Sequence, residues 1–159
     1  MKKFAVLVLA LVLCTTFLSG CGADPVAEEL EQFLSIDMLE INKLHADVSS
    51  ETKKWESFKK DKEAIESIED VLLPNFDEIL KGLSKISLGT AEVKAIKEKY
   101  QQSINVYKEG YEIFLQAFKA GDSDLVSAAS EKIRQAETLL KEYYSLTEAL
   151  AKEKEIELK

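Results

Sequence analysis

The side chains that could carry acid–base or metal chemistry do not form a recognisable motif in this sequence. His45 is the only histidine, and it stands between Leu44 and Ala46. A nucleophile–base pair or a zinc site needs partners at defined spacing, and the chain contains neither a His-Glu-x-x-His sequence nor a glycine-rich phosphate loop. We therefore interpret His45 as a partly exposed helix residue, and we predict that the protein is not an enzyme and needs no cofactor.

Two acidic segments are the candidates for a cation site. An EF-hand loop that opened at Asp122 would need glycine at its sixth position and glutamate at its twelfth, where the chain has Ser127 and Ile133. Glu66 and Asp70 lie four residues apart, but a di-metal helical bundle needs Glu-x-x-His motifs on facing helices, and the chain has none. We therefore predict no metal site, a helix cap at Asp122 and a solvated acidic face around Glu66.

The aromatic residues form the remaining candidate site. Tyrosine rings can line an inter-helix groove for a peptide, a glycan or a lipid tail, with the hydroxyl groups at the rim. Core packing is the favoured alternative for such a stripe. Trp55, the only tryptophan, either anchors the core beside Phe58 or is an exposed contact residue, and the sequence leaves both possibilities open. The tyrosines that could face a partner or ligand are Tyr100, Tyr107, Tyr111 and Tyr143.

The spacing of the apolar residues indicates which elements must position these side chains. Apolar residues recur every three or four positions and strict alternation is absent, which indicates helices rather than strands. Asp24 is a suitable N-cap for a first helix, and Pro25 suits its first turn. A turn near Ser49-Ser50 would end this helix. Alternatively, the helix continues toward Pro74, where the missing backbone N–H should kink or end it.

Two longer helices should follow. Thr90 is a suitable N-cap for the first of them, and Gly121 should end it in a left-handed conformation. Asp122 or Ser123 then begins the last helix. Because the turn between these helices is short, they must be antiparallel neighbours. We predict an all-α fold, an up-and-down antiparallel bundle of three or four helices over residues 25–155, without disulfides.

The N-terminal segment has the parts of a secretory signal. Two lysines follow the first methionine, an apolar run extends from Phe4 to Leu13, and the letters LSGC occupy positions 18–21. This segment resembles the lipobox of bacterial lipoproteins, in which the cysteine is acylated and the chain is cleaved just before it. The resemblance implies that residues 1–20 are a cleaved signal peptide and that Cys21 carries the lipid, palmitate or a similar acyl group.

A lipid on Cys21 accounts for the one cysteine that remains after cleavage, because Cys14 lies inside the signal. The folded part then has no disulfide and no thiolate metal site. Two or more acyl chains would hold the protein stably at the extracytoplasmic face of the cell membrane. Residues 21–24 form a short tether, in which residues 22–24 span roughly 10 Å when extended, so we expect the domain to lie close to the membrane.

The charge of the chain narrows the choice of partners. Asp and Glu number 29 against 21 Lys and Arg, a formal net charge of −8, and cleavage of the signal removes two of the lysines. A strongly acidic surface repels the phosphate backbone of nucleic acids. It also repels anionic membrane faces and anionic wall polymers. We therefore predict no nucleic-acid partner and a membrane association that depends on the lipid.

Part of the helical region is similar to small uncharacterised Gram-positive lipoproteins. The similarity rests on LGTAEVKAIKEKY from Leu88, on YKEGY from Tyr107, and on Gly121-Asp122 followed by a helix with spaced alanines. The Cys-Gly start and the Lys- and Glu-rich composition also resemble Gram-positive lipoproteins. The resemblance implies a helical extracytoplasmic domain of unassigned activity, with no catalytic residues to carry over.

These observations predict a membrane-anchored lipoprotein that acts as a non-catalytic protein-interaction module in the cell envelope. The short tether favours a partner that is itself at the membrane, most simply another envelope protein. The alternative is a ligand-binding module that uses the tyrosine-lined groove for a peptide, a glycan or a lipid. The identity of the partner or ligand and the oligomeric state do not follow from the sequence.

Overall fold

The computed structural model describes residues 24–158, and every regular element in that range is helical. The all-α prediction is therefore confirmed. The predicted count of three or four helices differs from the six α-helices found, because π and 3-10 segments divide the N-terminal half. The elements are α2 (Pro25–Gln32), the π-helix η1 (Phe33–Asp37), α3 (Leu39–Lys54), the 3-10 helix η2 (Trp55–Ser57), α4 (Asp61–Ser67), the π-helix η3 (Ile68–Leu72), α5 (Leu73–Lys85), α6 (Ala91–Ala120) and α7 (Ser123–Glu153).

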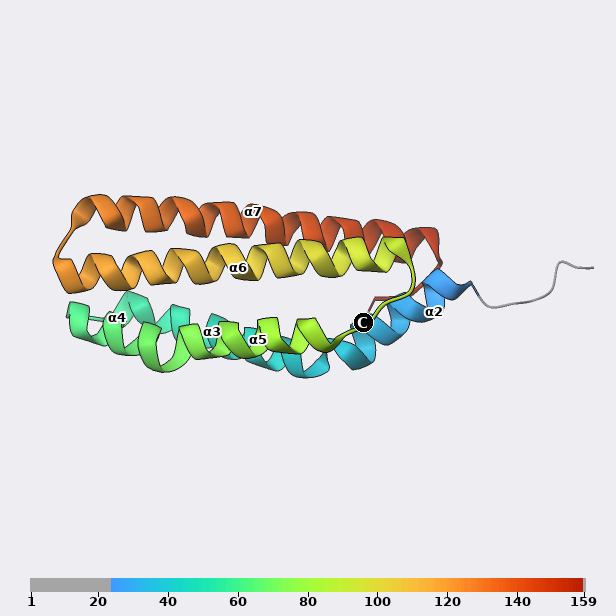
Figure 1. The fold of residues 1–159 in the computed structure, drawn as a ribbon, viewed down its shortest axis with the longest axis horizontal. Coiled ribbons are helices and arrows are strands. Elements are labelled where there is room, and N and C mark those ends of the chain that lie inside the picture. The colour runs from blue at the N-terminus through green and yellow to red at the C-terminus, as the bar shows by residue number, and fades with distance from the viewer. Residues whose placement is uncertain (1–23, 159) are drawn as a thin grey trace, which may run out of the picture.

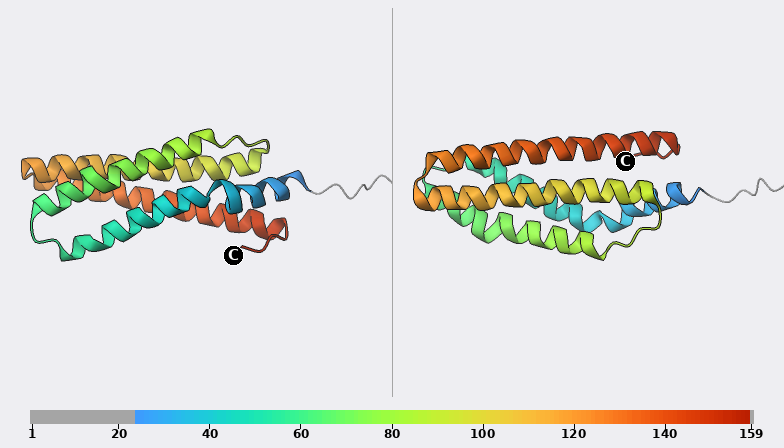
Figure 2. Two further views of the ribbon diagram at one scale, coloured as in Figure 1. Left: turned by 90° about the horizontal axis from the view of Figure 1, so that it is seen from below. Right: turned by 45° about the horizontal axis from the view of Figure 1, so that its top comes forward.

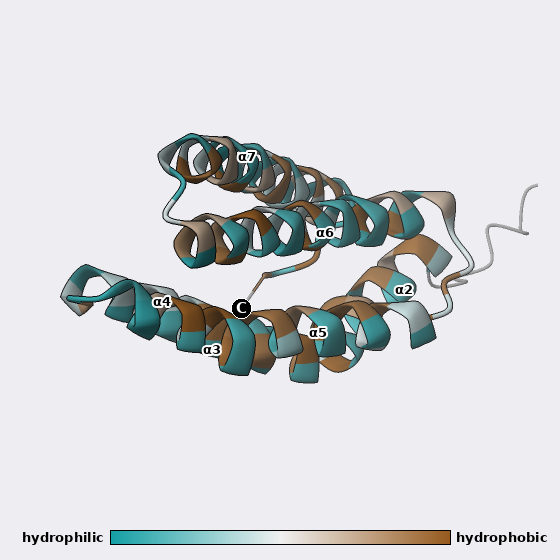
Figure 3. Ribbon diagram, turned by 60° about the vertical axis from the view of Figure 1, so that its left-hand side comes forward, coloured by the Kyte–Doolittle hydropathy of each residue, from teal (hydrophilic) through white to brown (hydrophobic). Residues whose placement is uncertain are grey.

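The elements form two layers that enclose the core. Helices α6 and α7 lie side by side and antiparallel, and α3, α4 and α5 form the second layer beneath them (Figures 1 and 2). Hydrophobic residues occupy the inner sides of both layers (Figure 3). The largest fully buried side chains come from both layers: Tyr100, Phe33, Phe76, Leu30, Met38, Ile68, Leu72, Ile79, Leu83, Ile104 and Val93.

The turn predicted near Ser49-Ser50 is wrong. Helix α3 runs through both serines to Lys54, and the chain leaves the helix only at Phe58, which has an extended backbone. Helix α4 then begins where the Glu63 carboxylate accepts hydrogen bonds from two preceding backbone N–H groups, at 2.6 and 2.9 Å. A carboxylate at the third helical position satisfies orphan donors at the helix start. The same break shows that one unbroken helix toward Pro74 is also wrong.

Pro74 does not end the helix, because the turn before it is widened. In η3 the Leu73 N–H bonds to the carbonyl of Ile68, five residues earlier rather than four. A π turn makes room for the proline ring at the start of α5, where its missing N–H costs little. A similar widened turn occurs in η1, where the Met38 N–H bonds to the Phe33 carbonyl at 3.0 Å. Asp37 lies at the end of this turn and is half-buried.

The turn between α6 and α7 follows the sequence pattern closely. Gly121 has φ +66°, the left-handed conformation expected after a helix. The Asp122 carboxylate then accepts hydrogen bonds from the N–H groups of Asp124 and Leu125 at 2.9 and 3.3 Å. A cap at both sides of a two-residue turn holds the helices antiparallel.

Small residues allow α6 and α7 to approach closely. A Cβ atom on Gly110 would lie 2.7 Å from Cδ1 of Ile133, well inside van der Waals contact. The Ser103 hydroxyl is fully buried and donates to the Ala136 carbonyl at 3.0 Å. This bond satisfies a polar group that would otherwise be costly to bury. The two helices therefore form one rigid pair against which the other layer packs.

The two ends of the described chain meet at one end of the molecule. After α7 the chain turns back, and the Ile156 N–H donates to the Ala151 carbonyl at 2.8 Å. Lys154 forms an ion pair of 3.0 Å with Asp24. Asp24 is also the N-cap of α2, since its carboxylate accepts the Val26 N–H at 2.9 Å. The start of α2 is therefore held against the C-terminal tail.

Glu29 of α2 binds the loop that leads into α6. Its carboxylate accepts hydrogen bonds from the Gly89 N–H, from the Thr90 N–H at 2.8 Å and from the Thr90 hydroxyl. Thr90 stands at the predicted N-cap position of α6, but its side chain makes no capping bond to that helix. Partial burial raises the pKa of Glu29, and the hydrogen bonds from Gly89 and Thr90 outweigh it, so the pKa lies below its usual value.

We expect Glu29→Gln to lower the free energy of unfolding by about 1–2 kcal/mol at pH 7, because hydrogen bonds to a charged acceptor are lost. Urea unfolding measures the change, and Glu28→Gln on the same helix is the control. A group whose folded pKa is depressed stabilises the protein above its unfolded pKa and loses that contribution as the pH falls through the folded value. The difference from wild type should therefore shrink below pH 4.5. An equal difference at pH 7 and pH 3 would contradict this account.

Candidate functional site

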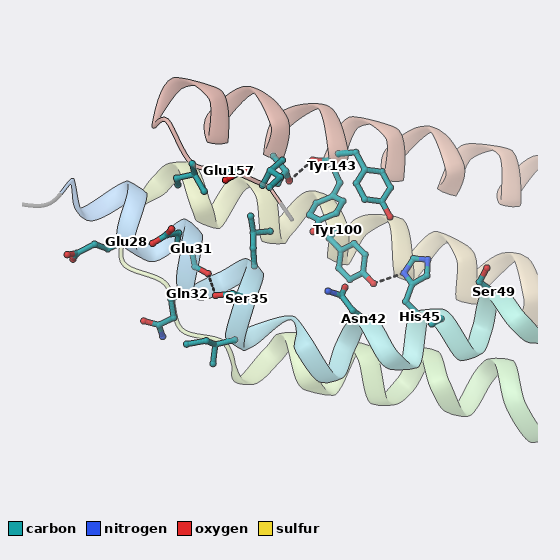
Figure 4. A pocket seen from close by; sticks show the side chains of 17 residues that line it. Glu28, Glu31, Gln32, Ser35, Asn42, His45, Ser49, Tyr100, Tyr143 and Glu157 are labelled. Carbon is teal, nitrogen blue, oxygen red and sulfur yellow. Dashed lines mark hydrogen bonds between the residues drawn. The ribbon is translucent and has the colours of Figure 1, made fainter.

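A groove of about 1100 Å³ lies between the N-terminal helices and α7. One wall is formed by α2, η1 and α3, and the other by α7 and the tail that follows it, with α6 beneath (Figure 4). The groove is slightly larger than the range of about 300–1,000 Å³ that is usual for ligand pockets in proteins. Its lining residues are Glu28, Glu31, Gln32, Leu34, Ser35, Ile36, Asn42, His45, Ala46, Ser49, Tyr100, Tyr143, Tyr144, Thr147, Ile156, Glu157 and Leu158.

His45 is not isolated, because it pairs with Tyr100 in the groove. The Nδ1 atom of His45 and the hydroxyl of Tyr100 share a hydrogen bond of 2.7 Å, and the two rings stack with centroids 5.9 Å apart (Figure 4). Burial lowers the pKa of His45, and burial raises the pKa of Tyr100. Both groups are therefore neutral at pH 7.

The predicted tyrosines separate into two groups. Tyr100 and Tyr143 line the groove, with ring centroids 4.9 Å apart. Tyr107 and Tyr111 do not line it, because their rings stack on Phe76 in the core at 6.1 and 5.6 Å. Burial raises the pKa of Tyr107 and that of Tyr143 to about 12 each. The tyrosine side chains therefore offer hydroxyl groups and ring faces but no negative charge.

Trp55 is an anchor of the core at the other end of the bundle. Its indole N–H donates to the Ser67 hydroxyl at 2.9 Å. Its ring meets Tyr111, Phe114 and Phe118 edge-on, with centroids 5.6, 5.7 and 6.0 Å away. These contacts favour the core role over the contact role, and they leave Tyr100 and Tyr143 as the predicted site residues that the fold brings together.

Several groove residues carried no clear signal in the sequence. Tyr144 is 50% exposed on the rim, and it follows a buried tyrosine. Two adjacent residues on a helix point in different directions, so only one of two neighbouring aromatic residues faces the core fully. The Tyr143-Tyr144 pair was therefore the one feature of the sequence that indicated an exposed ring here. Ile36 and Leu158 are 67% and 45% exposed on the same groove. Exposed apolar side chains beside a concave surface are typical of a binding site.

The acidic segments considered as cation sites have other partners. Glu66 forms an ion pair of 3.3 Å with Lys62, and Glu69 pairs with Lys119. Asp122 caps α7. Within residues 24–158, no three His, Cys, Asp or Glu side chains gather as a metal site would require. Glu66 and Glu69 therefore act in ion pairs, and Asp122 acts as a helix cap.

Comparison with known families identifies the chain. The family model described as "Uncharacterised lipoprotein PM1805" matches residues 27–155, from α2 to the end of α7. The chain belongs to this lipoprotein family. Membership supports a bacterial lipoprotein held at a membrane by lipid. The comparisons with curated proteins and with solved structures gave no match.

None of the helices between residues 24 and 158 is long and apolar enough to cross a membrane. The signal peptide at 1–20 and the acylated Cys21 lie outside the described residues, so these two assignments remain predictions from the sequence.

The neutral His45 makes the stability of this lipoprotein depend on pH. The unfolded imidazole binds a proton near pH 6.5, whereas burial lowers the pKa in the folded state. The contribution of the neutral His45 to the free energy of unfolding is fully present above pH 6.5. It is lost as the pH falls toward the lowered pKa of the folded state. We expect His45→Gln to lose less stability than wild type between pH 7.5 and pH 5.5 in chemical unfolding. The carboxylates titrate in both proteins and therefore do not contribute to the difference between them. An equal loss of unfolding free energy in both proteins over this pH range would contradict the prediction.

Proposed function

We propose that this lipoprotein is a non-catalytic binding module of the cell envelope, an up-and-down helical bundle that holds a segment of another envelope protein in its groove. The observation that supports this most is the groove itself, whose rim carries the exposed apolar side chains of Ile36, Tyr144 and Leu158. Such surfaces are kept on monomeric proteins mainly for interaction. The hydrogen bond that joins His45 Nδ1 to the Tyr100 hydroxyl supports a structural role for this pair.

The position of the groove favours a partner at the same membrane. Glu28 and Glu31 of α2 line it, and only residues 22 and 23 separate Cys21 from the N-cap of this helix. With lipid on Cys21, the groove would lie near the extracytoplasmic face of the cell membrane. In a Gram-positive cell, which the Cys-Gly start favours, this is the outer leaflet, and the partner would be a membrane protein or another lipoprotein.

A second candidate is a ligand-binding module for a free peptide, a glycan or a lipid tail. The paired rings of Tyr100 and Tyr143 support it, with centroids 4.9 Å apart beside the polar side chains of Asn42 and Ser49. Aromatic faces next to hydrogen-bonding groups are common in sites for such ligands. The size of the groove and its apolar rim favour a protein segment over a small ligand.

Photo-crosslinking in living cells tests the protein partner. We expect p-benzoylphenylalanine at Ala46, in the groove wall, to capture a defined envelope protein. The same residue at Lys85, on the exposed surface of α5, should not. Ala46→Trp should fill part of the groove and prevent co-purification of the captured protein, while circular dichroism confirms the helical fold. Equal capture at both positions, or capture that Ala46→Trp leaves unchanged, would overturn the proposal.

A further inference from the structure

The charges in the groove indicate which kind of segment it accepts. Three carboxylates line it, Glu28 and Glu31 from α2 and Glu157 from the tail, and no lysine or arginine is among its lining residues. In Figure 4 the labelled Glu28, Glu31 and Glu157 lie at one end of the groove, and His45 lies toward the other. The rest of the lining mixes uncharged polar side chains with apolar and aromatic ones, so the groove combines negative charge at one end with apolar and hydrogen-bonding surface along its length.

These three carboxylates are among the acidic side chains of residues 24–158 that have no basic partner in an ion pair. Some exposed carboxylates elsewhere do pair with lysines across the bundle: Asp77 with Lys108 at 2.6 Å, Glu109 with Lys132 at 2.7 Å and Glu142 with Lys99 at 2.8 Å. Within residues 24–158, no basic side chain lies within 4 Å of the carboxylates of Glu28, Glu31 and Glu157 in an ion pair. A bound partner could therefore supply their counter-charge.

We infer that the segment held in the groove is basic and amphipathic, with lysine or arginine side chains toward the α2 end and aliphatic side chains along the groove. This inference rests on the proposed function and names the chemistry of its partner. Opposite charges across an interface speed association and discriminate against wrong partners. Aliphatic side chains would cover Ile36 and Leu158, and a cationic group could also stack on the exposed Tyr144 ring.

The source that fits these features is a segment of a membrane protein next to the bilayer. The groove begins at α2, close in sequence to the predicted lipid on Cys21, so a membrane-bound partner would meet it at high local concentration. A neutral glycan would leave the carboxylates without a counter-charge. An anionic lipid headgroup or wall polymer would be repelled by them.

Binding of three matched peptides tests the inference directly. Each is a fluorescein-labelled 12-residue amphipathic peptide with the same leucines, and the polar positions are all lysine, all glutamine or all glutamate. The lipidated mature chain is held in phosphatidylcholine nanodiscs, which carry no net charge, and fluorescence anisotropy reports binding. We expect the lysine peptide to bind at least ten-fold more tightly than the glutamine peptide and the glutamate peptide not to bind. Raising the salt concentration should weaken the binding of the lysine peptide, because salt screens the attraction between opposite charges.

Matched variants locate the effect in the groove. The double variant Glu28→Gln with Glu31→Gln should bind the lysine peptide about ten-fold more weakly than wild type. Glu98→Gln with Glu137→Gln removes the same charge from exposed positions that do not line the groove, and it should stay within two-fold of wild type. Equal weakening by the two double variants, or equal binding of the lysine and glutamine peptides, would overturn the inference, as would failure of all three peptides to bind.

The two proposals can fail separately. Equal binding of the lysine and glutamine peptides that Ala46→Trp abolishes would leave the groove as a binding site and remove its preference for basic segments. Selective lysine binding without any crosslinked envelope protein at Ala46 would retain that preference and overturn the protein partner. The segment crosslinked at Ala46, identified by mass spectrometry, should contain at least two lysines or arginines and should come from a membrane protein. A neutral or acidic segment would contradict the inference.

Discussion

Phe76→Ala is expected to lower the free energy of unfolding by about 3–5 kcal/mol, a large part of the total of about 5–15 kcal/mol for a protein of this kind. Phe76 is 1% exposed and lies between the two layers of helices. Its ring stacks on those of Tyr107 and Tyr111. Removing the ring leaves a cavity that the packed helices cannot close. The variant therefore loses the free energy gained by burying the ring and also bears the cost of the cavity.

Urea or guanidinium unfolding followed by the fluorescence of Trp55 measures this loss, because Trp55 is the only tryptophan. Phe76→Leu should retain most of the stability. Leu39→Ala is the surface control, since Leu39 is 53% exposed and its removal should change stability by about 0.5 kcal/mol or less. A loss below 1 kcal/mol for Phe76→Ala would mean that the stacked rings are not the centre of the core.

The second large effect is expected at the anchor. Cys21→Ser should abolish labelling by a radioactive or alkyne-tagged fatty acid and should move the protein from the membrane fraction to the soluble fraction. Each buried CH₂ of an acyl chain contributes about 0.8 kcal/mol to membrane binding, so loss of two or more chains removes nearly all attachment. The thermal unfolding midpoint should be unchanged, because the core begins at Leu30.

Cys14→Ser is the matched control for the anchor variant, because it changes the other cysteine of the chain within the same N-terminal segment. We expect this variant to stay lipid-labelled and membrane-bound. If Cys21→Ser remained labelled and sedimented with membranes, the lipidation site assigned from the LSGC sequence would be wrong.

The local features of the fold were predictable because they depend on neighbours in the sequence. The cap at Asp24 joins residues two positions apart, and Gly121 and Asp122 form the turn before α7 with adjacent residues. The 3.6-residue period of the apolar positions also arises within each helix. These signals predicted an all-α chain and the starts and ends of its most regular helices.

The breaks in the N-terminal half were harder to predict, because they depend on competing local effects. Serines at positions 49 and 50 are weak helix breakers, and packing of α3 against α5 overrides them. The actual break depends on Glu63, which binds backbone N–H groups before α4. The widened turns η1 and η3 shift the phase of the helix by a fraction of a turn. No residue type in these segments predicts such a turn.

The sequence by itself therefore determined the class of protein and the helical fold, and it predicted the anchor at Cys21, through patterns that act over a few residues. Only the tertiary structure decided which tyrosines share a surface. It placed Tyr100 beside His45, 55 positions away, and Glu29 beside Thr90, 61 positions away. The physical reason is that a stripe of aromatic residues is compatible with core and groove alike. The relative rotation of packed helices selects between them, and that rotation is a property of the whole bundle.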